Sequence, residues 1–167
     1  MHAIGRGGVT LSEKWKDGAT TMHGMHVHGF PNFMISGTRQ ASWDNNFPYS
    51  QEIVATHIAE IIRYAKDHDI DQMEVTAEAE ADWVSFHEER SVQLLAIWRD
   101  CTPSYFNNEG NPDKAIARNG AFGGSITEFM ESLRAWRKSG HLEGLKLAQK
   151  SRPSSPEERT GVAMQPG

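Results

Sequence analysis

Three histidines near the start of the chain are candidate metal ligands. His23, His26 and His28 lie close together, and in a strand His26 and His28 would point to one face, as metal-binding His-x-His pairs do. A zinc site needs three or four ligands. Cys101 and several acids are available, but no spacing singles them out as further ligands. Metal binding is therefore an alternative to a half-exposed strand whose histidines are hydrogen-bonded.

Other reactive side chains occur later without a complete motif around them. His87 is followed by Glu88, but no second histidine follows at the spacing of a His-Glu-x-x-His zinc motif. We therefore place His87 on a solvated helix face. Cys101 would need a neighbouring base and a lowered pKa to act as a nucleophile, and the sequence indicates neither. The polar stretch around Asn107 lacks the fixed alternation of a calcium loop.

The loop that follows Gly37 is the strongest candidate for a ligand site. It comes after the short apolar run Phe33-Met34-Ile35, which predicts a buried strand, and it leads into a periodic helix near Ser50. Strand, glycine, loop and helix in this order are how an open α/β sheet presents a ligand site. A glycine lets backbone approach a ligand closely, and long loops in compact domains are often functional. An ordinary surface loop is the alternative.

Length and composition limit the class of protein. The chain has 167 residues, which favours one domain, and its formal net charge of -5 disfavours nucleic acid or an anionic membrane as a partner. No apolar run approaches the roughly 20 residues of a membrane span. A single cysteine, Cys101, excludes an internal disulfide and favours a reducing compartment, so we expect a cytoplasmic protein.

Periodicity predicts an α/β fold with about three helices and a few short strands. The polar connection from Asp100 to Ala121 is expected to be irregular. Residues 1–148 should be ordered, and the Pro-, Ser- and Glu-rich residues 149–167 should form a disordered tail. The predicted helices span about Ser50–Lys66, Thr76–Arg99 and Ser125–Lys138, and the predicted strands are Thr21–Val27, Phe33–Ile35, Gln72–Val75 and Leu142–Leu147.

Several segments carry a family resemblance when they are taken in order, namely Gly8-Val-Thr-Leu-Ser-Glu-Lys-Trp15 with Asp17-Gly18, His23-Gly24, Gly29-Phe-Pro-Asn-Phe-Met-Ile-Ser-Gly37, Asn107-Asn-Glu-Gly-Asn-Pro112 and Phe122-Gly-Gly124. From about Gly5 to Leu147, the chain resembles the C-terminal part of the Baeyer–Villiger monooxygenases. These enzymes are flavin monooxygenases that use FAD and NADPH.

The resemblance implies a fold, a reaction and a set of site residues. The fold would be the C-terminal fragment of a flavoprotein with two Rossmann-type dinucleotide-binding domains. The reaction would insert oxygen next to a ketone carbonyl through a peroxyflavin. No catalytic residue and no metal ligand are implied within this chain. The cofactor-binding residues would be Gly37, Thr38, Arg39, Gln40, Asn46, Phe47 and Asn107, and the substrate-binding residues would be Ser42, Trp43 and Asp44.

The chain also departs from the family pattern. Thr38 stands where many family members have proline, and Thr102 stands where a tryptophan is common. No G-x-G-x-x-G motif is present, so the N-terminal FAD- and NADP-binding regions would be missing partners and the isolated chain should be inactive. The alternatives are a non-catalytic binding or scaffold domain derived from this family, and a His-rich metal-binding protein.

Overall fold

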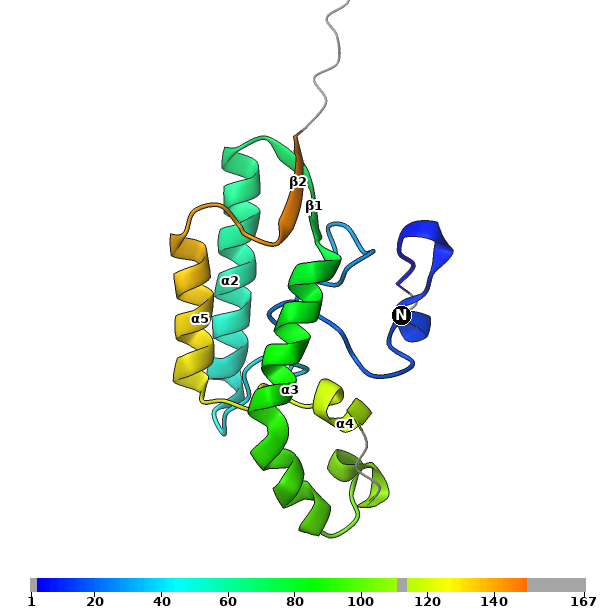
Figure 1. Cartoon of the computed structure of the whole chain (residues 1–167). Helices are drawn as coiled ribbons and strands as arrows, with labels where there is room; N and C mark the ends of the chain where they lie inside the picture. The colour runs from blue at the N-terminus through cyan, green and yellow to red at the C-terminus, as the bar shows by residue number, and fades with distance from the viewer. Residues whose placement is uncertain (1–2, 111–113, 150–167) are drawn as a thin grey trace, which may run out of the picture.

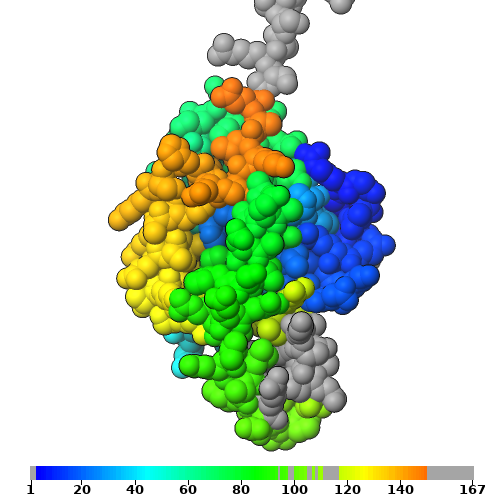
Figure 2. All heavy atoms as spheres, viewed as in Figure 1, coloured from blue at the N-terminus to red at the C-terminus, as the bar shows by residue number. Residues whose placement is uncertain are grey.

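The computed structural model describes residues 3–110 and 114–149 of the chain. Three long helices, α2, α3 and α5, enclose most of the core, and a two-stranded sheet closes one end (Figure 1). Figure 2 shows α3 running across one face of the molecule, with α5 on one side of it and the N-terminal segment on the other. The elements are η1 (Arg6–Gly8), α1 (Leu11–Lys14), α2 (Phe47–Asp67), β1 (Ile70–Val75), α3 (Ala77–Asp100), η2 (Tyr105–Gly110), α4 (Lys114–Asn119), α5 (Ile126–Lys138) and β2 (Leu145–Gln149).

The helix predicted from Ser50 begins earlier, at Phe47. The side chain of Asn46 caps it by accepting a hydrogen bond from the Tyr49 N–H. Pro48 fits the first turn, because a backbone N–H in this turn has no acceptor within the helix and proline lacks that N–H. Ser50 is consequently a buried residue inside the helix rather than its cap. The predicted start of this helix was therefore wrong, although its periodic core was predicted well.

The other two long helices agree closely with the sequence. Thr76 precedes α3, and its hydroxyl accepts a hydrogen bond from the Ala79 N–H at 3.1 Å. Ser125 caps α5 by accepting from the Glu128 N–H. The Glu128 carboxylate forms an ion pair with Arg90 on α3, at 2.6 Å.

None of the helices in the described part of the chain is both long enough and apolar enough to span a membrane.

Strand β1 pairs with a strand on one edge, and on the other edge it contacts Asn32 and His28 of the N-terminal segment. It runs antiparallel to β2, with Val75 opposite Leu145, so the two late strands predicted from the sequence are confirmed as elements. On the other edge, the Asn32 N–H donates to the Met73 carbonyl and the Asn32 Oδ1 accepts from the Met73 N–H, both at 2.8 Å. Asn32 therefore satisfies the backbone of β1 in place of a third strand.

The predicted bounds of these two strands were wrong at the ends, because β1 already begins at Ile70 and β2 covers Leu145–Gln149. Leu142 lies in the preceding turn with a φ of 44°, and Gln149 belongs to the strand rather than to the predicted tail.

The two strands predicted before residue 36 do not form. The segment from Met22 to His26 is a tight turn, because His23 and Gly24 both have positive φ values, 58° and 72°. Only isolated bridges remain, from Met22 to His26 and from His26 to Met34. Met25 is nevertheless fully buried. The apolar residues of this segment thus reach the core as a turn, which periodicity alone does not distinguish from a short strand.

The connection between α3 and α5 is more ordered than expected. It contains η2 and α4. His87 on α3 is fully buried, and its Nε2 lies 2.6 Å from the Ala117 carbonyl of α4. The prediction that His87 lies on a solvated helix face was therefore wrong.

Two predicted segments lie outside the described residues. They are residues 111–113, which include Pro112 of the matched loop, and residues 150–167 of the predicted tail.

A group of buried histidines occupies the centre of the core. The His23 ring lies edge-on to Trp83 at 4.8 Å, to Trp136 at 5.0 Å and to His57 at 5.5 Å between centroids. The Arg137 guanidinium donates to His57 Nδ1 at 2.6 Å, and a guanidinium has no acceptor. The His57 proton therefore resides on Nε2, and His57 is neutral.

Burial holds these imidazoles in the neutral form. It is the largest cause that lowers the pKa of His57 to about 3, with the Arg137 charge adding to it. Burial likewise lowers the pKa of His26 to about 4 and lowers that of His23, where the charges of His57, His26 and Arg137 add to the effect. Arg137 is itself paired with Glu60 on α2.

We predict that the free energy of unfolding falls as the pH falls from 6.5 to 5. The buried histidines regain their ordinary pKa of 6.5 on unfolding, so only the unfolded chain takes up protons in this window. The stability they contribute is therefore present above pH 6.5 and is lost below it, at up to about 1.4 kcal/mol per histidine and pH unit.

Urea unfolding at several pH values measures this slope. The variant His57→Gln should have a shallower pH dependence, because one neutral buried imidazole is removed. The variant His68→Gln changes an exposed histidine at the end of α2 and should keep the wild-type slope. Equal slopes for wild type and His57→Gln would contradict this assignment.

Candidate functional site

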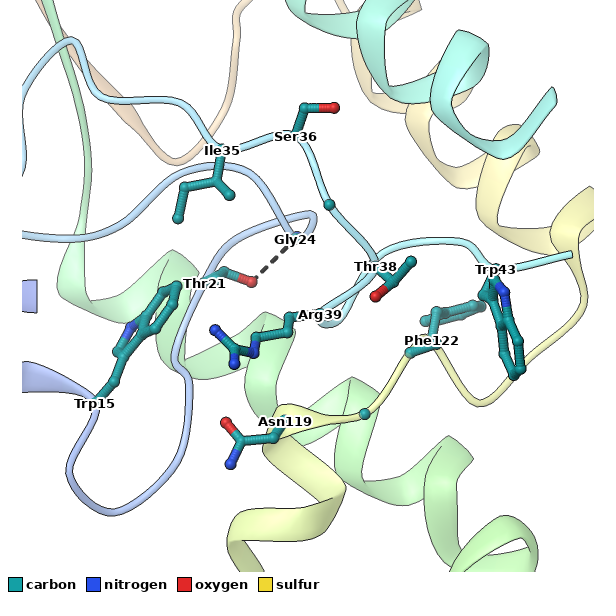
Figure 3. A pocket seen from close by; sticks show the side chains of 13 residues that line it. Trp15, Thr21, Gly24, Ile35, Ser36, Thr38, Arg39, Trp43, Asn119 and Phe122 are labelled. Carbon is teal, nitrogen blue, oxygen red and sulfur yellow. Dashed lines mark hydrogen bonds between the residues drawn. The ribbon is translucent and has the colours of Figure 1, made fainter. Parts of the chain in front are cut away.

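An open cavity of about 630 Å³ lies where three separate parts of the chain meet (Figure 3). Its volume is within the range of small-molecule sites. The N-terminal segment, the loop around Gly37 and the connection before α5 each supply part of its wall. Four of the residues that the resemblance placed in a site line it: Gly37, Thr38, Arg39 and Trp43. The other lining residues are Trp15, Thr21, Gly24, Ile35, Ser36, Asn119, Gly120, Ala121 and Phe122.

Gln40 holds these three parts together from behind the cavity. Its side chain is fully buried, and its Nε2 donates to the Ala19 carbonyl at 2.6 Å and to the Arg118 carbonyl at 3.0 Å. Its Oε1 accepts from the Thr21 hydroxyl at 2.8 Å, and its backbone N–H donates to the Gly120 carbonyl at 2.7 Å. Gln40 is not among the lining residues, so its side chain positions the wall of the cavity, and its contact with a cofactor stays a prediction.

Further hydrogen bonds link the same three parts of the chain at this junction. The Phe122 N–H donates to the Ala41 carbonyl at 2.9 Å, and the Asn119 Oδ1 accepts from the Ala19 N–H at 3.1 Å. The Thr21 hydroxyl also accepts from the Gly24 N–H at 3.1 Å, the bond drawn in Figure 3. The three segments are thus fixed relative to one another by backbone and buried amide groups, which have few alternative partners in the core.

The cavity wall is mainly aromatic and aliphatic, with one charged side chain. Trp15, Ile35, Trp43 and Phe122 supply apolar surface, and Trp43 is 59% exposed. Among the described residues of the lining, Arg39 alone is charged. Its guanidinium carbon lies 5.8 Å from the centroid of the Trp15 ring (Figure 3), a distance at which the ring face attracts a cation.

The residues on either side of Trp43 lie outside the lining and lead into α2. Ser42 is buried, 2% exposed. The Asp44 carboxylate accepts from the Asn46 N–H at 2.8 Å, and Asn46 in turn caps α2. Phe47 is 48% exposed. These four residues stay predictions as contacts of a cofactor or substrate, since none of them lines the cavity.

Asn107 lies elsewhere, inside its own loop. Its side chain is buried, and its Oδ1 accepts from the backbone N–H groups of Ser104 at 2.7 Å and Gly110 at 3.1 Å. Its Nδ2 donates to the Thr102 carbonyl at 3.1 Å. These bonds shape the 101–110 loop. A contact of Asn107 with a nicotinamide cofactor stays a prediction, and the residue is not part of the cavity lining.

Sequence reasoning missed part of the wall because its residues are distant along the chain. Trp15, Phe122 and Gly24 fell within matched segments, but nothing in those segments indicated that they meet. Asn119 and Gly120 lay in a connection expected to be irregular. A weak signal existed in the glycine pair after Phe122, since close packing of backbone favours glycine. A Cβ on Gly123 would lie 2.5 Å from the Arg90 carbonyl oxygen.

The residues present fit the ring of a flavin better than its pyrophosphate. A Cβ on Gly37 would meet no atom within 4 Å, so open space lies beside this backbone and a planar ring can approach it. The aromatic and aliphatic walls suit such a ring. The pyrophosphate of a dinucleotide is normally held by a glycine-rich turn at a helix N-terminus, and the sequence contains no G-x-G-x-x-G.

The histidines do not form a metal site in the structure. Within residues 3–110 and 114–149, no group of three or more histidine, cysteine, aspartate or glutamate side chains could hold a metal ion. His28 turns away from the buried group, and its Nδ1 lies 2.9 Å from the Val75 carbonyl. The turn at His23 removes the strand on which the His-x-His interpretation depended.

Comparison with known proteins identifies the relatives of this chain. No protein-family model matches it. The FAD-binding monooxygenase hmp7 of Hypomyces subiculosus is 40% identical over 84% of this chain and 23% of that protein. Baeyer–Villiger monooxygenase 4 of Dietzia sp. strain D5 is 40% identical over 85% of this chain and 23% of that protein.

A solved structure agrees with the sequence matches. The polycyclic ketone monooxygenase of the thermophilic fungus Thermothelomyces thermophila has a TM-score of 0.80 at 30% identity, over 89% of this chain and 24% of that one. The chain thus spans about a quarter of the length of these proteins. The resemblance to the Baeyer–Villiger monooxygenases and the α/β fold that it implied are confirmed.

We predict that alanine substitutions at two glycines of the lining change the free energy of unfolding by different amounts. A Cβ on Gly24 would lie 2.6 Å from the Ala41 Cβ, and Gly24 has a φ of 72°. Gly24→Ala should therefore lower the free energy of unfolding by about 2–3 kcal/mol through overpacking and backbone strain. Gly37→Ala meets open space and should change it by less than about 1 kcal/mol.

Urea unfolding of the two variants beside wild type measures the difference. A loss at Gly37→Ala equal to that at Gly24→Ala would show that Gly37 is needed for packing. In that case the open face at Gly37 would not be available to a ligand.

Proposed function

We propose that this chain forms one wall of the flavin and ketone site of a Baeyer–Villiger-type monooxygenase. The complete enzyme would use FAD and NADPH to insert oxygen next to the carbonyl of a small-molecule ketone. The observation that carries the proposal is the cavity beside Gly37, in a chain whose relatives include an FAD-binding monooxygenase. FAD would supply the redox chemistry when bound, with NADPH as the source of hydride.

The residues of the chain would bind and orient the ring and keep water away from it. Gly37 and Thr38 would present backbone to one face of the ring, because no side chain fills the space beside Gly37. Trp15, Ile35 and Phe122 would cover apolar surface of the ligand. A dry, preorganised wall of this kind strengthens every electrostatic interaction inside the site.

Trp43 would limit the size of the ketone. It is a large and exposed aromatic residue on the wall, so it removes volume from the cavity. We place Ser42 and Asp44 on the same substrate side, and Asn46 and Phe47 at the edge of the flavin ring. Contacts of this apolar kind discriminate between ketones by only about 1–3 kcal/mol per methylene, so Trp43 would tune the choice of substrate without setting the reaction.

The remaining parts of the enzyme would supply the groups that bind the dinucleotide phosphates. They would contain the FAD- and NADP-binding regions, and the 101–110 loop around Asn107 would close over the nicotinamide cofactor. We also propose a cytoplasmic location, supported by the single, exposed cysteine, Cys101. Nucleic acid and membrane surfaces are not proposed as partners, since the net charge is -5.

We predict that a chimeric enzyme distinguishes this function from that of a non-catalytic binding domain. The matching quarter of the Dietzia enzyme is replaced by residues 5–147 of this chain. The chimera should purify with FAD absorbance and oxidise NADPH faster when a ketone is added. The 167-residue chain alone should retain no flavin, because it lacks a phosphate-binding glycine motif.

The matched control is the same chimera carrying Gly37→Leu, which fills the open space beside the backbone. It should remain folded but lose ketone-dependent oxidation. A folded chimera without flavin, or stoichiometric FAD in the isolated chain, would contradict the proposed function.

A further inference from the structure

Arg39 brings an isolated positive charge to the cavity. Of the lining residues that the structure describes, it alone is charged, in a protein whose net charge is -5. Its side chain is exposed. Within the part of the chain that the structure describes, the arginine and lysine ion pairs use Arg6, Lys14, Arg90, Arg118 and Arg137, and none of them uses Arg39.

The position of this charge is fixed from two sides. The guanidinium lies over the Trp15 ring, 5.8 Å from its centroid, and Figure 3 shows the side chain extending toward that ring. The next residue, Gln40, is anchored by its backbone N–H to the Gly120 carbonyl and by its buried amide. Arg39 is thus a restrained cation whose planar set of N–H donors can meet a carboxylate or phosphate in two parallel hydrogen bonds.

The surroundings of Arg39 favour a ligand with two chemical parts. Trp15, Ile35 and Phe122 offer apolar surface next to it, and no aspartate or glutamate is among the lining residues within 3–110 and 114–149. An anion at this place therefore meets no opposing carboxylate from the described part of the wall. An apolar ring meets the aromatic surface at the same time.

We propose that the cavity binds a ring compound that carries an anionic oxygen group, and that Arg39 pairs with that group. This inference rests on the proposed function only in placing a ligand in this cavity. The anion has two possible sources with the same chemistry, namely the carboxylate of an acidic ketone substrate and the phosphate that the ribityl chain joins to the flavin ring. Both present an oxyanion that is covalently joined to a ring.

Binding to the full 167-residue chain tests the pairing without any turnover. The probes are 2-naphthoate and its neutral methyl ester, and the readout is the shift of the Trp15 indole and Thr38 amide signals in NMR spectra. Wild type should bind the acid about three- to tenfold more tightly than the ester. Arg39→Gln should remove this preference, and Arg39→Lys should retain part of it. Arg134→Gln, at an exposed position on α5 outside the lining, should leave it unchanged.

A second pair of probes separates the two sources of the anion. Riboflavin 5′-phosphate and riboflavin differ only in the phosphate. A preference for the acid without a preference for riboflavin 5′-phosphate assigns Arg39 to the substrate, and a preference for the phosphate in the flavin pair assigns it to the cofactor. The proposal is overturned if neither pair shows a preference for the anion, or if Arg39→Gln leaves the preference intact. Failure of the chimera to turn over would not change these binding results.

Discussion

The buried side chain of Gln40 is the constraint on which the site depends. Its amide meets three partners from two distant segments, the Ala19 carbonyl, the Thr21 hydroxyl and the Arg118 carbonyl. A buried amide left without partners costs about 1–3 kcal/mol for each unsatisfied group, so the native fold must bring these segments to fixed positions. The residues next to them along the chain line the cavity. The shape of the candidate site therefore follows from the hydrogen bonds of one residue that does not face it.

The same junction connects the site to the hydrophobic core. Phe122, whose N–H donates to the Ala41 carbonyl, also stacks on Trp83 at 5.8 Å and contacts Phe129. The turn that begins after Thr21 places Met22 and Met25 in the same core. Residues of the cavity wall are consequently packed directly against the hydrophobic core. Preorganisation of this kind is what a ligand site requires from its scaffold.

The sequence could predict those parts of the fold that depend on interactions between residues close together along the chain. Helices α3 and α5, for example, are capped by Thr76 and Ser125, which immediately precede them. The start of α2 was predicted late because Ser50 is as good a cap by type as Asn46, and only tertiary packing buries it. The turn at His23 could not be predicted, because a non-glycine residue with positive φ is uncommon.

The candidate site divides in the same way. The loop from Gly37 to Trp43 was predicted from the glycine, the loop length and the family resemblance, and four of its residues line the cavity. The position of Gln40 could not be predicted, because its partners lie about 20 and 78 residues away along the chain. The burial of His87 was missed for a similar reason, since the Ala117 carbonyl that it meets comes from a separate helix.

Hydrogen exchange at the Gln40 side chain measures whether this amide holds the three segments of the site together. If the Gln40 amide holds the site together, its Nε2 protons should exchange slowly, as slowly as the backbone N–H of the fully buried Phe129. The side chain of Gln93, on the exposed part of α3, supplies the reference for a free amide. Exchange of the Gln40 side chain at the rate of Gln93 would contradict the account, because it would show that the junction opens independently of the core.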